Sequence, residues 1–148
     1  MNGDPSPPPA NSALSPTRDS TLRVRAVPTL VLLLAETLVG NELAVVGSPY
    51  PLGYLAAHVV LSLLLVGFTA HIFLRSLRLP SAAARVAGGV TFLSTLGATI
   101  SGSVFLWGGG SQFAVDGMEG LAGLAILGAI LLLVFGSVVT PSPDKRSA

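Results

Sequence analysis

The chain alternates four long apolar runs with short polar breaks. The runs cover about residues 26–46, 53–74, 83–107 and 113–139. Each run is close to the roughly 20 residues that an α-helix needs to cross a hydrocarbon core. The breaks between them contain proline and glycine, which do not continue a helix. This pattern predicts an all-α fold, namely a polytopic membrane protein whose four transmembrane helices pack as a bundle.

The segments outside the apolar runs are polar. Residues 1–25 include the run Pro7, Pro8 and Pro9 and show no apolar periodicity. A segment with so few apolar residues cannot bury enough surface to fold alone. We therefore predict a disordered tail over residues 1–25 and a second short tail over residues 140–148.

Composition supports a membrane protein and excludes several functions. Hydrophobic residues make up 51% of the chain and charged residues only 10%, whereas a soluble domain carries about 25% charged residues. The lipid bilayer is therefore a predicted partner. Nucleic acid is not, because the net charge is +1 and the basic residues are scattered. The absence of cysteine excludes disulfides, thiolate metal sites and iron–sulfur clusters.

The basic residues predict an orientation. All of them fall on one side of the four-span arrangement: Arg18, Arg23, Arg25, Arg75, Arg78, Arg85, Lys145 and Arg146. An excess of Lys and Arg marks the cytoplasmic side of a membrane protein. Both tails are therefore predicted to be cytoplasmic, with the bundle in the cell or plasma membrane.

Small residues predict which helices pack most closely. The third run carries a row of small side chains at alternating spacings of four and three: Ala84, Gly88, Thr91, Thr95, Ala98 and Gly102. The fourth run carries a comparable row: Met118, Ala122, Ala125, Ala129, Leu132 and Gly136. Such rows let helix backbones approach closely in lipid. We expect the third and fourth helices to be the tightest pair.

Glu36 is the candidate for proton or cation chemistry inside the membrane. It lies ten residues into the first run, where an acidic side chain costs about 2.5–3.5 kcal/mol to insert. Ionisable residues at such depth mark ion or proton pathways. The alternative is a protonated carboxyl that makes one hydrogen bond to another helix.

A second group of polar residues is expected nearer the outer surface. Asn41, Glu42, His58, Met118 and Glu119 all fall at a similar depth below the two outer loops. His58 and Met118 are candidate ligands of haem iron, because histidine and methionine are both axial ligands. His58 and Glu119 are candidates for a divalent metal, and Glu42, like Glu36, for a proton or cation site. The alternative makes Glu119 a helix N-terminal charge and Met118 a packing residue.

The histidines of the second run are 13 residues apart. On a helix of 3.6 residues per turn they are rotated by roughly 140° from each other. His58 and His71 therefore cannot hold stacked haems along one face of this helix. His71, beside Arg75, is interpreted as an interfacial or helix-contact residue.

Three segments resemble the four-helix halves of haem A synthases and related b-type haem membrane proteins. They are "GYLAAHVVLSLLL" with His58, "TFLSTLGATISGSVFL" in the third run and "GMEGLAGLAIL" with Met118. The resemblance spans about residues 26–139 and implies that His58 binds haem b opposite a histidine on the fourth helix. This chain has Met118 in place of that histidine.

A second resemblance leads to a different function. Four short spans with one carboxylate in the first are similar to the small multidrug transporters, and the matching residue is Glu36. That resemblance implies exchange of a proton for a cation. The tail before the first span and the outer His and Glu group depart from the pattern.

A third possibility needs no site at all. A non-catalytic accessory subunit, part of a homo-oligomer or a larger membrane complex, requires only the rows of small residues. No catalytic motif is present, so no catalytic residue is assigned and the question of enzymatic activity is left open.

Overall fold

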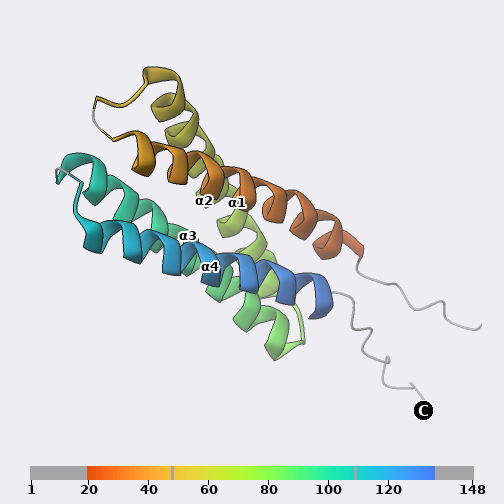
Figure 1. The fold of residues 1–148 in the computed structure, drawn as a ribbon. Coiled ribbons are helices and arrows are strands. Elements are labelled where there is room, and N and C mark those ends of the chain that lie inside the picture. Colours follow the sequence, from red (N-terminus) through yellow and green to blue (C-terminus); the bar gives the residue numbers. More distant parts are fainter. Residues whose placement is uncertain (1–19, 48, 109, 136–148) are drawn as a thin grey trace, which may run out of the picture.

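The computed structural model of the protein describes residues 20–47, 49–108 and 110–135. They form four α-helices (Figure 1): α1 Ser20–Val46, α2 Leu52–Ser76, α3 Ala82–Trp107 and α4 Gln112–Phe135. Each helix is long and apolar enough to cross a membrane. The predicted fold, a four-span integral membrane protein, is confirmed. Most of the first predicted tail, residues 1–19, and all of the second lie outside the described residues.

Local sequence determines where the helices begin and end. Gly47 has φ 69°, in the left-handed region where glycine commonly ends a helix. Pro51 stands directly before α2. At the start of α3 the Ser81 hydroxyl oxygen accepts a hydrogen bond from the backbone N–H of Ala84 at 3.3 Å, as a helix-capping serine does. The expected breaks therefore lie where proline, glycine and serine predict them.

The first helix begins six residues before the predicted start. Its extra turns are packed, since Leu22 and Ala26 are buried in a cluster with residues of the other helices. The longer helix places Pro28 in its interior, where proline cannot donate a backbone hydrogen bond. The next residue is Thr29, and its hydroxyl donates a hydrogen bond to the Arg25 carbonyl at 2.9 Å. Packing of these first residues against other helices explains why α1 starts earlier than predicted, because a hydropathy pattern does not reveal such packing.

The four helices are arranged in a ring, in chain order. Each packs on its neighbours in the sequence, and α4 closes against α1; within the described ranges the backbones of the diagonal pairs do not approach each other, so these pairs meet only through side chains. Figure 1 shows α1 beginning and α4 ending at the same end of the bundle. We call this the basic end, because Arg75, Arg78 and Arg85 lie in and beside the α2–α3 turn there. The other end, with the α1–α2 and α3–α4 loops, is the loop end.

Helices α3 and α4 make the most extensive contact, as predicted. A Cβ atom on Gly128 would lie 3.0 Å from the backbone nitrogen of Thr91 and 3.2 Å from the carbonyl oxygen of Ala87. The two backbones therefore touch where neither helix carries a large side chain. Most of the two predicted rows is buried: Ala84, Gly88, Thr91, Thr95 and Gly102 on α3, and Ala125, Ala129 and Leu132 on α4.

Apolar side chains close the half of the bundle that adjoins the basic end. One buried cluster contains Leu22, Ala26, Ile72, Ala87 and Leu132. A second lies nearer the middle of the bundle and contains Leu33, Leu65, Ala125 and Ala129. All four helices contribute to these two clusters. The ionisable residues Glu36 and His58 lie beyond them, toward the loop end, whereas the buried hydroxyl residues Thr29, Thr69 and Ser76 lie within this half.

Candidate functional site: a cavity beside Glu36 and His58

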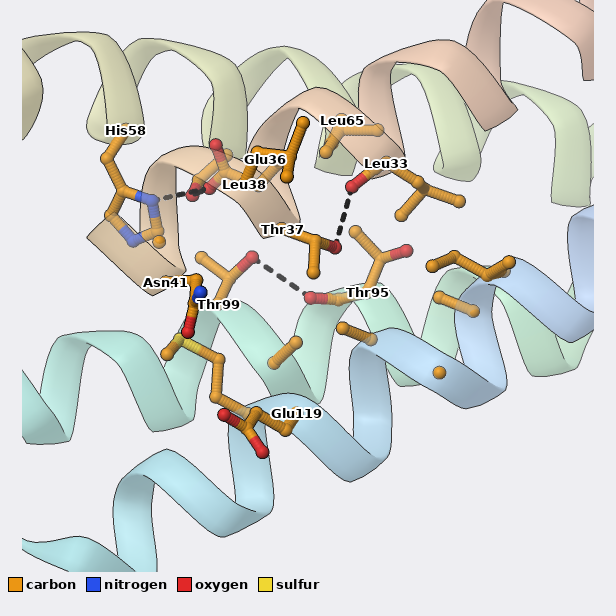
Figure 2. A pocket seen from close by; sticks show the side chains of 18 of the residues that line it. Leu33, Glu36, Thr37, Leu38, Asn41, His58, Leu65, Thr95, Thr99 and Glu119 are labelled. Carbon is orange, nitrogen blue, oxygen red and sulfur yellow. Dashed lines mark hydrogen bonds and ion pairs between the residues drawn. The ribbon is translucent and has the colours of Figure 1, made fainter. Parts of the chain in front are cut away.

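A cavity of about 310 Å³ lies inside the bundle, above the second apolar cluster. All four helices line it, and Figure 2 shows their side chains converging on it. Its walls are mainly apolar, with the polar residues Glu36, Thr37, Asn41, His58, Ser62, Thr95, Thr99 and Glu119 among them. Ligand sites are typically clefts of about 300–1,000 Å³ with a few placed polar groups. The cavity therefore has the size and character of a small-molecule site.

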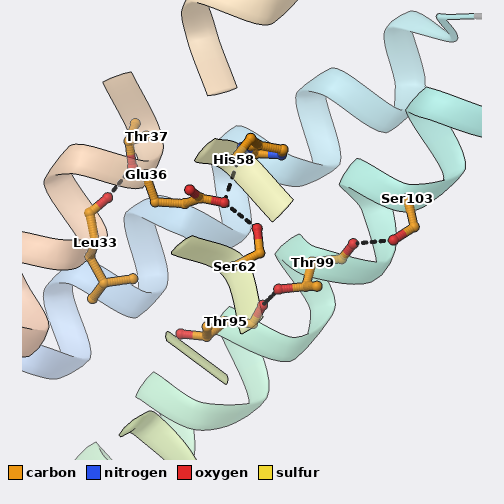
Figure 3. Close-up of polar contacts among 8 residues, drawn as sticks. All are labelled: Leu33, Glu36, Thr37, His58, Ser62, Thr95, Thr99 and Ser103. Carbon is orange, nitrogen blue, oxygen red and sulfur yellow. Dashed lines mark hydrogen bonds and ion pairs between the residues drawn. The ribbon is translucent and has the colours of Figure 1, made fainter. Parts of the chain in front are cut away.

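Glu36 of α1 and two residues of α2 form the polar centre of this cavity. Oε1 of Glu36 lies 3.0 Å from Nδ1 of His58, and the Ser62 hydroxyl donates a hydrogen bond to the same oxygen (Figure 3). The two ionisable side chains are largely covered, with 15% of Glu36 and 12% of His58 exposed. His58 and Ser62 are one turn apart on α2, so both reach one carboxylate.

Hydrogen bonding at this centre is incomplete. Oε2 of Glu36 and Nδ1 of His58 are buried and have no hydrogen-bond partner among the described residues. The close approach of Nδ1 to Oε1 is thus an electrostatic contact without hydrogen-bond geometry. Buried polar atoms are nearly always hydrogen-bonded, and an exception needs an explanation. A ligand or proton shared at this carboxylate supplies one.

Two glycines make room for the imidazole. A Cβ on Gly40 of α1 would lie 3.3 Å from Cε1 of His58, and a Cβ on Gly102 of α3 would lie 3.6 Å from Nε2. The ring therefore sits between two helix backbones that carry no side chain at those points. Met118 of α4 also approaches Gly102, with its sulfur 3.4 Å from the same Cβ position.

The hydroxyl groups around the cavity already donate their protons. Thr37 donates to the Leu33 carbonyl at 2.8 Å. On α3, Thr95 donates to the Thr91 carbonyl at 2.8 Å and Thr99 to the Thr95 carbonyl at 2.9 Å. Figure 3 shows this ladder of hydroxyls along α3. The oxygen atoms of these groups retain the capacity to accept further hydrogen bonds.

The structure brings together four of the five residues expected at the outer level. Asn41, His58, Met118 and Glu119 all line the cavity. Glu42 does not line it and is exposed. Adjacent residues of a helix point about 100° apart, so Asn41 and Glu42 cannot both face the same cavity. The role of Glu42 as a proton or cation site stays a prediction.

The contact between Glu36 and His58 was not foreseen from the sequence. Glu36 lies about 15 Å along α1 from its loop end and His58 about 9 Å along α2. The two backbone positions therefore differ in depth by about 6 Å, a distance that the extended side chains of Glu36 and His58 can bridge. Depth measured from the shared α1–α2 loop shows that the two side chains could reach each other, but not that α1 and α2 turn these faces together.

His71 forms a separate contact at the basic end. Its Nε2 atom is paired with the Arg25 guanidinium of α1, and the residue is exposed. This agrees with its interpretation as a helix-contact histidine.

The arrangement around His58 does not fit haem. His58 and Met118 do converge, and a carboxylate on the other ring nitrogen is a common way to orient a histidine ligand. However, the Nε2 atom faces the α3 backbone at Gly102, where a porphyrin would need that helix to move away. Haem b with His58 and Met118 as its ligands is an untested expectation from the sequence, and binding it would require the bundle to rearrange around His58.

A metal site has limited support. Within residues 20–47, 49–108 and 110–135, no three His, Asp or Glu side chains lie close enough together to hold an ion. His58 and Glu119 both line the cavity, and their role as a metal pair stays a prediction.

Comparison of the chain with known protein families, curated proteins and solved structures finds no match. The two family resemblances therefore rest on the residues quoted for them. What the protein does must be argued from the cavity.

Proposed function

We propose that the protein is a small proton-coupled transporter that binds an organic cation at Glu36. The observation that carries this proposal is the buried Oε2 atom of Glu36, which lacks a hydrogen-bond partner among the described residues and belongs to a side chain that lines the cavity. A carboxylate buried in a membrane is costly unless it is paired or protonated. A cation and a proton therefore compete for the same group.

His58 and Ser62 position this carboxylate and take part in the exchange. Both act on Oε1, which leaves Oε2 free for the cation. A carboxyl and an imidazole in contact can share one proton. When a cation binds at Oε2, the pair releases that proton, and when the cation leaves, a proton returns. Such competition couples the movement of the two.

The apolar clusters support a cycle with alternating access. They close the cavity toward the basic end, so the described arrangement corresponds to one end state. Transporters place their binding sites near the middle of the membrane and expose them to one side at a time. The resemblance to small multidrug transporters implies the same use of Glu36. An accessory subunit, in contrast, has no need of a cavity that ends at a carboxylate oxygen without a hydrogen-bond partner among the described residues.

The test compares two glutamates of one helix. Purified protein is reconstituted in liposomes, and uptake driven by a pH gradient is measured for monovalent organic cations from tetramethylammonium to 4-phenylbutylammonium. We expect Glu36→Gln to abolish the uptake that wild-type protein supports, because the amide cannot exchange a proton. Glu42→Gln is the matched control, since Glu42 is exposed and does not line the cavity.

Two results would contradict the proposal. One is the absence of pH-driven uptake of every cation by folded wild-type protein. The other is undiminished uptake by Glu36→Gln, which would make Glu36 a structural residue. Loss of uptake in Glu42→Gln alone would transfer the role to that residue.

A further inference from the structure

The polar groups of the cavity wall are mostly hydrogen-bond acceptors, and the Asn41 amide and the His58 ring are the lining side chains that can still donate. The hydroxyl groups of Thr37, Ser62, Thr95 and Thr99 all donate inside the protein. Toward the cavity they can therefore only accept. The unpartnered Oε2 of Glu36 adds a strong acceptor. A ligand that matches this surface must bring its own N–H or O–H donors.

The ionisable residues that line the cavity indicate the charge of its ligand. The ionisable residues that line the cavity are Glu36 of α1, His58 of α2 and Glu119 of α4. Helix α3 contributes none, and among the described lining residues there is no lysine or arginine. Two carboxylates face at most one imidazolium. A positively charged ligand therefore has a favourable electrostatic interaction, whereas an anion does not.

The exposed parts of the cavity wall lie on only two helices. Thr37, Leu38 and Asn41 of α1 and Glu119 and Gly123 of α4 are exposed. The described lining residues of α2 and α3 are buried or only partly exposed. The cavity thus opens sideways, between α1 and α4. Leu38, which is 69% exposed, belongs to a membrane-spanning helix, so this opening faces lipid.

We infer that the cavity takes the ammonium group of a lipophilic amine, which enters from the bilayer between α1 and α4. The inference rests on the proposed function and specifies its substrate class and route. The ammonium N–H groups bind Oε2 of Glu36 and the threonine oxygens, while the apolar part contacts the leucine and alanine walls. A quaternary ammonium of the same shape carries the charge but has no N–H to donate.

The substrate class is tested by binding to the full chain in lipid nanodiscs. Dissociation constants are measured by calorimetry for 4-phenylbutylammonium and for its N,N,N-trimethyl analogue, with empty nanodiscs subtracted. We expect the primary amine to bind about tenfold more tightly, because a site built for hydrogen bonds rejects a ligand that lacks them. Glu36→Gln should remove this preference, and Glu42→Gln should retain it.

The route is tested with a matched pair of glycines on α4. A Cβ on Gly123 or on Gly120 would meet nothing within 4 Å, and both residues are exposed. Only Gly123 lines the cavity. The exchange of 4-(4-fluorophenyl)butylammonium between bilayer and protein is followed by fluorine NMR. We expect Gly123→Leu to exchange several times more slowly than Gly120→Leu, which should match wild type. Leu38→Ala, on the opposite rim, should accelerate exchange.

Different outcomes of these experiments would refute the entry route, the substrate class or the proposed function. Equal exchange in Gly123→Leu, Gly120→Leu and Leu38→Ala, with binding intact, would refute entry from the bilayer. Equal or tighter binding of the trimethyl analogue, still dependent on Glu36, would refute the amine class and leave the proposed function standing. Absence of any Glu36-dependent binding would refute both proposals together.

Discussion

The contact between α3 and α4 at Gly128 permits a quantitative prediction. Gly128→Ala places a Cβ 3.0 Å from the backbone nitrogen of Thr91 and 3.2 Å from the carbonyl oxygen of Ala87. Backbone atoms cannot rotate away as a side chain can, so the two helices must separate. Inserting one carbon into a packed interior costs about 1–3 kcal/mol. Replacing a glycine inside a helix by alanine stabilises the helix by about 0.5–1 kcal/mol, which offsets part of this cost.

A second glycine of α4 isolates the packing effect. Gly120→Ala gains the same helix propensity and meets nothing within 4 Å. The difference between the two variants is therefore the overpacking cost, about 1–3 kcal/mol. The assay is unfolding in mixed micelles with increasing sodium dodecyl sulfate, followed by circular dichroism, which gives the free energy of unfolding. If Gly128→Ala and Gly120→Ala unfold at the same detergent composition, the close helix contact is refuted.

Three further predictions concern the site and the topology. Ser62→Ala removes the hydroxyl donor to Glu36 and should lower the free energy of unfolding by about 1–3 kcal/mol, whereas Ser62→Thr should not; unfolding in mixed micelles measures both. Protein expressed with ample haem should show no Soret band, and a band that disappears in His58→Ala would instead establish haem binding. Reporter fusions within residues 76–81 should report cytoplasm, and fusions within residues 108–111 the opposite side; the reverse pattern would refute the predicted orientation.

The fold was predictable because hydropathy and helix breakers act locally. The bounds of α2 and α3 and the start of α4 lie within two residues of the prediction. Among the helix bounds that the structure describes, the start of α1 differs, since Leu22 is held by residues of other helices; the predicted end of the fourth span at residue 139 lies outside the described residues. Burial against a distant part of the chain leaves no local signal in hydropathy.

The sequence predicted how deep the site residues lie along their helices, but not how each helix is rotated about its axis. Rise along a helix fixes the level of each residue, which correctly brought His58, Met118 and Glu119 to one height. The same reasoning included Glu42, because level does not tell which neighbouring residue faces inward. It also separated Glu36 from His58, whose contact depends on how α1 and α2 rotate about their axes. Rotation is determined by packing among all four helices, including the space left by Gly40 and Gly102.

The two histidines of α2 have a mechanical consequence. His58 contacts Glu36 near the middle of α1, and His71 contacts Arg25 near its start. These contacts lie about 20 Å apart along the helix. Two contacts at separate levels oppose sliding of α1 along α2 more than either contact does alone, and the contact at His71 is the weaker one because it is exposed. A rocking motion that leaves both contacts intact would therefore move α1 and α2 together against α3 and α4.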